Sequence, residues 1–318
     1  MKFAWVLILF VLAGCGQAGN APTAATPPAS NANADLEKVL SDVNQQWLCA
    51  GPYRKTYKDC VEFRSKYWVD QFFEVIPSGE LLNKEEMVAT QTSRIPSNPD
   101  PRTGPYPDAF QLRAVYGDFA MATDHTNFMT ADKSGRVSFT SNSKVLRLFI
   151  KENGVWRPAA AGLVPIIAPT GPVPPSVHST APRKSPDEQL EKELAEIDRA
   201  WMDSSDMNKR VAYVSKMFAD QWFEILGWDP TANPTKASTV EVLSRYAKAN
   251  TVPGVVADQF QLQAVFGDVA LASDRRTRTW KNDQGQMVKT PHRSLLVFVK
   301  QNGEWRSAGA SLTPIMAP

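Results

Sequence analysis

The chain of 318 residues has few of the residues on which most enzyme and metal chemistry depends, with three cysteines and three histidines. The histidines, His125, His178 and His292, are widely separated, and this scatter supports neither a zinc site nor a Ser-His-Asp triad. No GxxxxGK(S/T), HExxH, CxxC or GxSxG pattern occurs. These absences exclude the best-defined motifs of nucleotide-binding, metalloprotease, dithiol and hydrolase sites. We therefore expect no metal and no cofactor.

An excess of charge of one sign is also lacking. Lys and Arg number 35 against 33 Asp and Glu, which gives a net charge of +2. A nucleic-acid partner would need a clustered basic face, and this balance gives no case for one. The apolar content of 43% and the charged content of 21% are ordinary for globular protein. At this length they predict about two domains, each able to bury its own core.

The apolar run from Phe3 to Ala13 follows a single lysine and is too short to span a bilayer. Its length fits the hydrophobic region of a signal peptide. The run ends in Leu12-Ala13-Gly14-Cys15, which resembles the bacterial lipobox, whose cysteine is lipidated and becomes the mature N-terminus. Gly16 rather than Asp follows, as in lipoproteins sorted to the outer membrane of Gram-negative bacteria. The resemblance implies a periplasm-facing lipoprotein of the cell envelope, anchored through Cys15; a secreted protein with a chance cysteine is the alternative.

Lipidation of Cys15 leaves Cys49 and Cys60, an even pair in an oxidising compartment. We expect them to form a disulfide, and the alternative is two free thiols. By the loop-entropy description, a closed loop of about a dozen residues stabilises the folded state by roughly 3 kcal/mol. Two cysteines alone offer too few ligands for a metal.

Two segments lack the apolar residues needed to build a core. Residues 16–33 are rich in Ala, Pro, Thr and Asn and predict a flexible tether, and residues 168–184 are Pro-rich and predict a linker. The expected organisation is a signal peptide and lipobox at 1–15, the tether at 16–33, a domain at 34–167, the linker at 168–184 and a second domain at 185–318.

The two expected domains are copies of each other. FQLRAVYGDFAMATD at 110–124 returns as FQLQAVFGDVALASD at 260–274, with ten of fifteen positions identical. VDQFFEV at 69–75 likewise returns as ADQWFEI at 219–225. The offset between the copies falls from 154 at the first helix to 150 at this second match. The first copy therefore has four extra residues in the segment that holds the cysteine pair.

Each copy begins with helical patterns and ends with strand patterns. In the second copy, Leu190, Leu194 and Trp201 recur at helical spacing. From Phe260 onward the apolar period changes to two, and Gly267-Asp268 predicts a turn. Helices followed by an antiparallel meander predict an α+β domain.

Particular residues in this order look like the SnoaL-like, ketosteroid-isomerase-like cone fold of the nuclear transport factor 2 superfamily. They are a tryptophan in the first helix, the D-x-F-x-E-x-x-x-S-G run at 70–79, the Gly-Asp turn and a closing K-x-N-G-x-W-R at 151–157 and 300–306. The resemblance implies three helices packed on a curved antiparallel sheet in each copy, enclosing an apolar pocket. It also implies that the copies pair through their sheets as an intramolecular pseudo-dimer. Members include enzymes and plain binding modules, so the fold does not determine the function.

The isomerase branch of this superfamily uses an Asp base just before a Pro at the end of the first strand. Here Ile76 precedes Pro77, and Leu226 takes that place in the second copy, so steroid-isomerase chemistry is not expected. Strand alternation puts Glu74 and Glu224 on the same face as these residues. A carboxyl group in an apolar cone is expected to have a raised pKa, which suits acid–base chemistry. The alternative is a structural Glu bonded to the helix layer or to water.

Residues that differ between the copies are the remaining candidates. Trp228 and Trp280 have no counterpart in the first copy and are candidates for a pocket mouth, a partner surface or incidental loop residues. Arg276 and Arg278 share one strand face and, with Arg293 on the next strand, are candidates to bind an anionic ligand or an acidic partner. The alternative is a solvated edge hairpin, because charged residues also protect sheet edges.

These features favour a membrane-anchored lipoprotein without catalytic activity. It would bind a small apolar ligand or an envelope protein through its two cone domains. An enzyme that uses Glu74 or Glu224 as a general base is the alternative.

Overall fold

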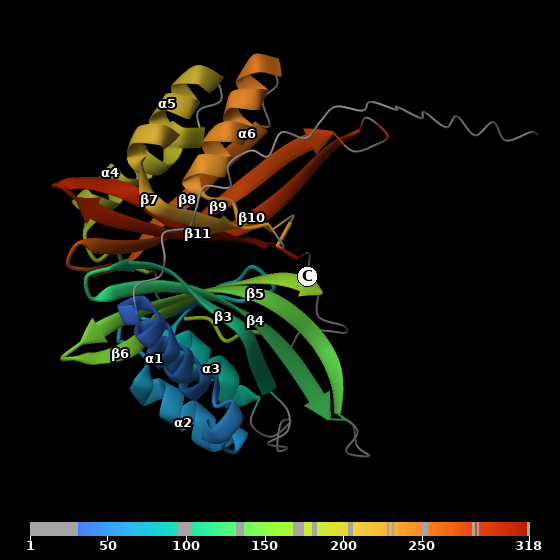
Figure 1. Ribbon diagram of the computed structural model, residues 1–318. Coiled ribbons are helices and arrows are strands. Elements are labelled where there is room, and N and C mark those ends of the chain that lie inside the picture. The colour runs from blue at the N-terminus through green and yellow to red at the C-terminus, as the bar shows by residue number, and fades with distance from the viewer. Residues whose placement is uncertain are drawn as a thin grey trace, which may run out of the picture.

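The computed structural model describes residues 31–94, 104–131, 137–167, 175–179, 183–202, 206–227, 229–230, 232–249, 254–281, 284 and 286–316. Figure 1 shows two units of similar design, stacked so that their sheets face each other and their helices lie on the outside. Cys15, the expected signal peptide and the expected tether up to residue 30 lie outside the described residues.

The first unit begins with helices and continues with a meander of long strands. Asn83 caps the third helix: its side chain accepts from Glu86 N, and the Glu86 carboxylate accepts from Asn83 N. In chain order the elements are α1 (Asn31–Leu48), η1 (Gly51–Tyr53), α2 (Tyr57–Tyr67), β1 (Phe73–Val75), β2 (Leu81–Asn83), α3 (Lys84–Ser93), β3 (Gly104–Tyr116), β4 (Phe119–Ala131), β5 (Val137–Glu152) and β6 (Val155–Ile167).

The second unit repeats this order, without counterparts of η1 and β2 among its described residues. Asp187 Oδ1 accepts the first free amides of its opening helix, those of Gln189 and Leu190. The elements are α4 (Glu188–Met202), α5 (Met207–Met217), β7 (Phe218–Ile225), α6 (Lys236–Ala249), β8 (Gly254–Phe266), β9 (Val269–Lys281), β10 (Met287–Gln301) and β11 (Glu304–Pro314).

Both units are α+β, as the sequence predicts. The sheet orders are β2-β1-β6-β5-β4-β3 and β7-β11-β10-β9-β8. The sheets are mixed rather than wholly antiparallel, because β1 runs parallel to β6 and β7 runs parallel to β11. The whole meander separates these neighbours along the chain, so no tight hairpin imposes an antiparallel direction on them.

The fifteen-residue repeat forms the same hairpin in both units, β3–β4 in the first and β8–β9 in the second. Gly117 and Gly267 adopt φ values of 61° and 60° in its turn, a conformation that glycine accepts without steric cost. The next residues, Asp118 and Asp268, each accept a 2.7 Å hydrogen bond through the backbone oxygen, from Lys151 N and Lys300 N. The repeated sequence therefore encodes a turn that also fixes the following strand.

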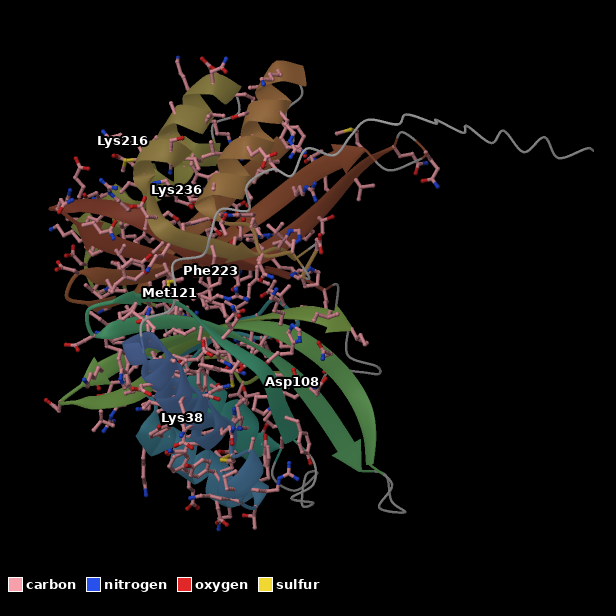
Figure 2. The ribbon with its side chains drawn as sticks, viewed as in Figure 1. Lys38, Asp108, Met121, Lys216, Phe223 and Lys236 are labelled. Atoms are coloured by element: carbon pink, nitrogen blue, oxygen red, sulfur yellow. A yellow bond between two sulfur atoms is a disulfide. The ribbon has the colours of Figure 1, made fainter. Side chains whose placement is uncertain are left out.

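The two sheets pack directly against each other, and residues of both units share one core cluster. A Cβ atom added at Gly162 of β6 would lie 2.0 Å from Ser311 Oγ of β11, and one added at Gly309 would lie 2.5 Å from Met121 Cε. Met121 and Phe223 lie between the sheets in Figure 2. Small residues therefore set the close approach of the units.

Hydrogen bonds also join the two units. Lys144 Nζ donates to Asn233 Oδ1 at 2.5 Å, and Thr313 Oγ1 donates to Leu163 O at 2.9 Å. Val265 N donates to Gln71 Oε1 at 3.1 Å. The units are thus in contact through apolar packing and polar bonds, as an intramolecular pseudo-dimer requires.

The predicted disulfide is confirmed: Cys49, just after α1, is bonded to Cys60 in α2. Both cysteines are buried. The four extra residues of the first copy lie in the connection between these helices, which the disulfide closes. The disulfide therefore links the end of α1 to α2, and it does so in the first unit only.

The described part of the linker lies along the first unit. Val177 N donates to Thr90 Oγ1 at 2.8 Å, and Ser179 N donates to Glu86 Oε1 at 2.9 Å. The imidazole Nε2 of His178 lies 2.8 Å from Glu80 Oε1. The chain between the units is thus attached to α3 and to the residues just before it.

Candidate functional site

A cavity of about 230 Å³ lies inside the second unit, between the helices and the sheet face that they cover. Helices α4, α5 and α6 and strands β7 to β11 all contribute to its lining. Its apolar wall includes Leu226, Val242, Leu243, Val255 and Leu312, and its polar groups include Arg210, Glu224, Arg276, Arg278 and His292. The interior of this cone is therefore a pocket with a small number of ionisable groups.

Arg276 is a buried cation held between two carboxylates. Its Nη2 donates to Asp198 Oδ1 at 2.6 Å, and its Nε donates to Asp274 Oδ2 at 2.8 Å. Burial lowers the pKa of Arg276, but the charges of Asp198, Asp274 and Glu224 outweigh it and leave the pKa above its ordinary value. This cluster joins α4 to β9, and the positive charge of Arg276 is compensated by its two carboxylates.

Arg210 of α5 is a second buried guanidinium on the cavity, and it is 5% exposed. Its Nε and Nη1 make no hydrogen bond to the described part of the chain. The guanidinium lies 5.0 Å from the centre of the Trp201 ring, and that of Arg276 lies 5.3 Å from it. Burial, followed by repulsion from Arg276, lowers the pKa of Arg210. Because buried charges are normally paired, Arg210 is the polar group of this pocket that most needs an acceptor.

Glu224 of β7 lines the same cavity and is 7% exposed. Burial raises the pKa of Glu224 to about 7, with Arg276 opposing the shift and Asp274 adding to it. The carboxyl group is therefore partly protonated at neutral pH. In that state it can donate a hydrogen bond as well as accept one.

His292 of β10 contributes no charge at neutral pH. The residue is 1% exposed, and burial lowers its pKa to about 4. Its Nδ1 lies 3.1 Å from Thr290 O. The imidazole therefore presents a neutral ring to the cavity.

The first unit also holds a buried Arg–Asp pair. Arg147 Nε donates to Asp124 Oδ2 at 2.9 Å, and the Arg147 guanidinium lies 4.5 Å from the Trp47 ring centre. Asn44 Nδ2 donates to the same Asp124 oxygen at 2.6 Å, and Thr126 Oγ1 accepts from Arg147 Nη2 at 2.9 Å. A buried carboxylate on the second hairpin strand is thus common to both units.

The arginine of this pair comes from a different position in each unit. At the offsets of the two copies, Asp124 corresponds to Asp274, but Arg147 corresponds to Leu296 and Arg276 to Thr126. The charge on the first helix differs as well, since the counterpart of Asn44 is Asp198. Both units therefore have a buried Arg–Asp pair. Its arginine lies on the third strand of the meander in the first unit (β5) and on the second strand in the second unit (β9).

Helices α2 and α5 differ at the position that matters most for the cavity. They correspond at an offset of 150, which places Cys60 opposite Arg210. The first unit therefore has its disulfide where the second has an arginine on the pocket. The first unit has its own buried arginine, Arg64, but Arg64 Nε donates to Trp47 O at 2.8 Å and Nη2 donates to Leu48 O at 3.0 Å.

Glu74 occupies the place of Glu224 in the first unit. Burial raises the pKa of Glu74 to about 7, and Arg147 and Arg64 oppose this shift. Its neighbours on the chain and across the sheet match those of Glu224, since Glu74 pairs with Ala161 and Glu224 with Ala310. The two carboxyl groups occupy corresponding backbone positions, but their cationic neighbours come from different positions.

The structure brings together two of the three arginines singled out from sequence. Arg276 and Arg278 both line the cavity, whereas Arg293 pairs with Arg275 across β9 and β10 and so lies on the opposite sheet face. Arg276 is not part of an exposed basic surface, because its strand face is covered by the helices and it is 2% exposed. Trp228 lies outside the described residues; Trp280 lies on β9, and its side chain is outside the described part.

Sequence reasoning missed Arg210 and Asp198. A charged residue on an amphipathic helix is ordinarily solvated, and nothing in either helix marked these two as buried. The signal that could have found them is the comparison of the two copies, which sets Arg210 against Cys60 and Asp198 against Asn44.

Within the described residues, no group of three or more His, Cys, Asp or Glu side chains is arranged to hold a metal ion. No helix of the described part has both the length and the apolarity needed to cross a membrane.

Comparisons with known proteins give likenesses of fold. No protein-family model and no curated protein sequence matches the chain. Similar solved structures include an NTF2-like protein from Cytophaga hutchinsonii (15% identity, 41% of this chain and 99% of that chain, TM-score 0.33). Another is a ketosteroid isomerase-like protein from Erwinia carotovora atroseptica (14% identity, 41% of this chain and 100% of that chain, TM-score 0.33). A third is the association domain of C. elegans CaMKII (13% identity, 42% of this chain and 98% of that chain, TM-score 0.35). Each likeness concerns the fold alone.

Proposed function

We propose that the protein is a non-catalytic binding protein of the cell envelope, lipidated at Cys15, whose second cone holds a small ligand. The observation that carries this proposal is the cavity of the second unit, with its apolar wall and its buried Arg210 and Glu224. Small-molecule sites are typically concave and mostly apolar, with a few well-placed polar groups. The volume of about 230 Å³ suits a small ligand.

A small ligand is favoured over a protein partner for two reasons. Arg276, a candidate for binding an anionic ligand or an acidic partner, is buried in an ion-paired cluster. The sheet faces that a cone unit would offer to a partner pack on each other within this chain. The surfaces that sequence suggested for a protein partner are thus largely occupied.

The proposed location in the envelope rests on residues 1–15. We assign the first unit a supporting role: it connects the binding unit to the anchored end of the chain. Its α1 and α2 are stapled by the disulfide, and the linker is bonded to its α3. This unit would hold the binding unit at a fixed position relative to the anchored end of the chain.

Native mass spectrometry of the full-length protein, extracted from an envelope fraction, tests the proposal. A bound small molecule is expected, and it is expected to be lost when Val242 on the cavity is changed to Trp. Val155→Trp is the matched control, since Val155 is an exposed valine of the first unit, 53% exposed against 42% for Val242. Retention of the molecule by Val242→Trp, or its equal loss in both variants, would place binding elsewhere.

Catalysis is the second candidate, and the raised pKa of Glu224 is the observation that favours it. A general base works best when its pKa lies near the operating pH. If the pocket is catalytic, a molecule recovered from the Glu224→Gln variant should be converted by the wild-type chain. Recovery of the same unaltered molecule from both forms would exclude turnover of that molecule.

A further inference from the structure

We infer that the second cone binds a small amphipathic carboxylic acid, with the carboxylate held by the guanidinium of Arg210 and the apolar part against the inner wall of the cavity. This inference rests on the proposed function, because it names the ligand class of that same pocket.

The first argument is the unsatisfied state of Arg210. Its Nε and Nη1 make no hydrogen bond to the described residues, although the side chain is only 5% exposed. A buried charged donor without an acceptor costs free energy, and native proteins seldom leave one. Arginine presents its donors as a planar fork that fits a carboxylate with two parallel hydrogen bonds. The missing partner of Arg210 is therefore best supplied by a carboxylate.

The second argument is the charge around Arg210. The neighbouring Arg276 has its own carboxylates, Asp198 and Asp274, at 2.6 and 2.8 Å. Arg278 also lines the cavity and adds a positive charge. With both carboxylates ionised and Glu224 neutral, the three arginines leave one net positive charge around the pocket, which favours an anion beside Arg210.

Glu224 could compensate Arg210 only if it were ionised. Burial raises the pKa of Glu224 to about 7, so much of this group is neutral at and below that pH. Glu224 and Arg210 both line the cavity, and the attraction of Glu224 only partly opposes the lowering of the Arg210 pKa. A neutral Glu224 can donate its own hydrogen bond to a bound carboxylate. Arg210 and Glu224 then act on the same head group.

The apolar wall specifies the rest of the ligand. Leu226, Leu243 and Val255 line the same cavity as the charged groups, together with Leu312 and Tyr246. Burying apolar surface here favours a hydrocarbon chain or a ring over a polar body. The cavity of about 230 Å³ limits this part to a short chain or a single ring. A dicarboxylate or a sugar acid does not fit this wall.

The test is isothermal titration calorimetry on the chain from Gln17 onward, which keeps both units and the linker. The probes are hexanoate and phenylacetate, each compared with a neutral counterpart, hexanol and 2-phenylethanol. We expect the acids to bind at least about tenfold more tightly than the alcohols, because a charge-assisted fork is lost in the alcohols. Arg210→Met should remove this preference and leave alcohol binding in place, which also shows that the variant is folded.

Two further variants sharpen the test. Arg210→Lys keeps the charge without the fork and should fall between wild type and Arg210→Met. Lys209→Met is the matched control, since Lys209 is the adjacent cation on α5 and its side chain is 85% exposed; it should leave all affinities unchanged.

The pH dependence gives an independent readout. Acid binding should weaken as the pH rises through about 7, because ionised Glu224 repels the carboxylate, and Glu224→Gln should remove this step. The charges of Arg276, Asp274 and Arg210 act on Glu224, and Asp198 from α4 is bonded to Arg276. Tyr246 from α6, Arg278 from β9 and His292 from β10 line the same cavity. A step that persists in Glu224→Gln would overturn the role of Glu224 in binding.

The outcomes separate the inference from the function on which it rests. If acids and alcohols bind equally and Arg210→Met changes neither, the carboxylate inference is wrong while a small-ligand pocket remains. If no acid binds but native mass spectrometry reveals a bound neutral molecule, the inference fails in the same way. If no probe binds and no molecule co-purifies, both the inference and the proposed function are overturned.

Discussion

Arg276 Nη2 lies 2.6 Å from Asp198 Oδ1, and this contact ties the first helix of the second unit to its sheet. Both side chains are buried, at 2% and 3% exposure of the residues. Removing the cation would leave Asp198 and Asp274 buried without compensation. We expect Arg276→Met to lower the free energy of unfolding by about 3–5 kcal/mol, as for other broken buried pairs. Urea denaturation measures the loss, and Arg275→Met, next to it on the opposite strand face, is the control.

The first unit suggests a second substitution that should restore stability when Arg276 is replaced. Its arginine stands where the second unit has Leu296, and its Thr126 stands where the second has Arg276. Arg276→Thr combined with Leu296→Arg should therefore regain part of the stability lost in Arg276→Thr alone. A coupling energy of about 0.5–3 kcal/mol is expected for such neighbours. Strict additivity of the two changes would show that the ion pair cannot move between these positions.

Gly162→Ala should destabilise the interface between the units. The new methyl carbon would lie 2.0 Å from Ser311 Oγ, well inside contact distance. Overpacking of this kind costs about 1–3 kcal/mol, visible as a lower thermal midpoint. Ser311→Gly removes the colliding atom, so the double variant should recover most of the loss. A lower midpoint for Gly162→Ala that Ser311→Gly does not restore would trace the loss to the strand itself.

Replacing both Cys49 and Cys60 by Ala should destabilise the first unit by about 3 kcal/mol, since the unfolded chain loses a closed loop. Hydrogen exchange is expected to quicken in α1 and α2, which the bond joins. The counterpart helix α5 has Arg210 at the place of Cys60 and should keep its protection, so it serves as the internal reference. Equal quickening in α5 would mean that the two units unfold together.

Glu74 and Glu224 should make the protein more stable at pH 5 than at pH 8, and together they outweigh His292, whose lowered pKa acts in the opposite direction. Burial raises the pKa of both Glu74 and Glu224 from 4.5 to about 7, so the folded state holds these protons more tightly than the unfolded state. This contribution is complete below about pH 4.5 and is lost as the pH rises through about 7. A shift of this size corresponds to about 3 kcal/mol for each group.

Urea denaturation at the two pH values checks this dependence. Glu74→Gln and Glu224→Gln should each flatten it, whereas Glu193→Gln, at an exposed position of α4, should leave it unchanged. A free energy of unfolding that stays level from pH 5 to pH 8 in the wild type would contradict the raised pKa values.

The helices, the hairpins and the disulfide could be predicted because they depend on local patterns. Apolar spacing marks α4, and a period of two followed by Gly267 marks the β8–β9 hairpin. The parallel placement of β1 and β7 could not be predicted, since it depends on neighbours far away in the chain. Strand alternation assigns residues to the two faces of a sheet but does not tell which face carries the helices, for a physical reason. One face of each sheet packs on helices and the other on the second sheet, so both faces are buried.

The site residues also divide into those that a local pattern predicts and those whose burial depends on distant parts of the chain. Glu224 was placed on the inner face by its alternation with Leu226, and both line the cavity. Arg276 reads as a surface cation from its charged neighbours, and only the presence of Asp198 on a distant helix explains its burial. Arg210 carries no local mark at all, because its burial depends on how α5 lies over the sheet.

The contact of Gly162 with Ser311 has a consequence for how the two copies can pair. These residues correspond in the two copies, at an offset of 149, so each unit meets its own counterpart position across the interface. Two second units paired in this way would set serine against serine, with the same 2.0 Å collision that a Cβ at Gly162 would make. Two first units would set glycine against glycine and leave a gap. At this contact the two halves are therefore complementary rather than equivalent.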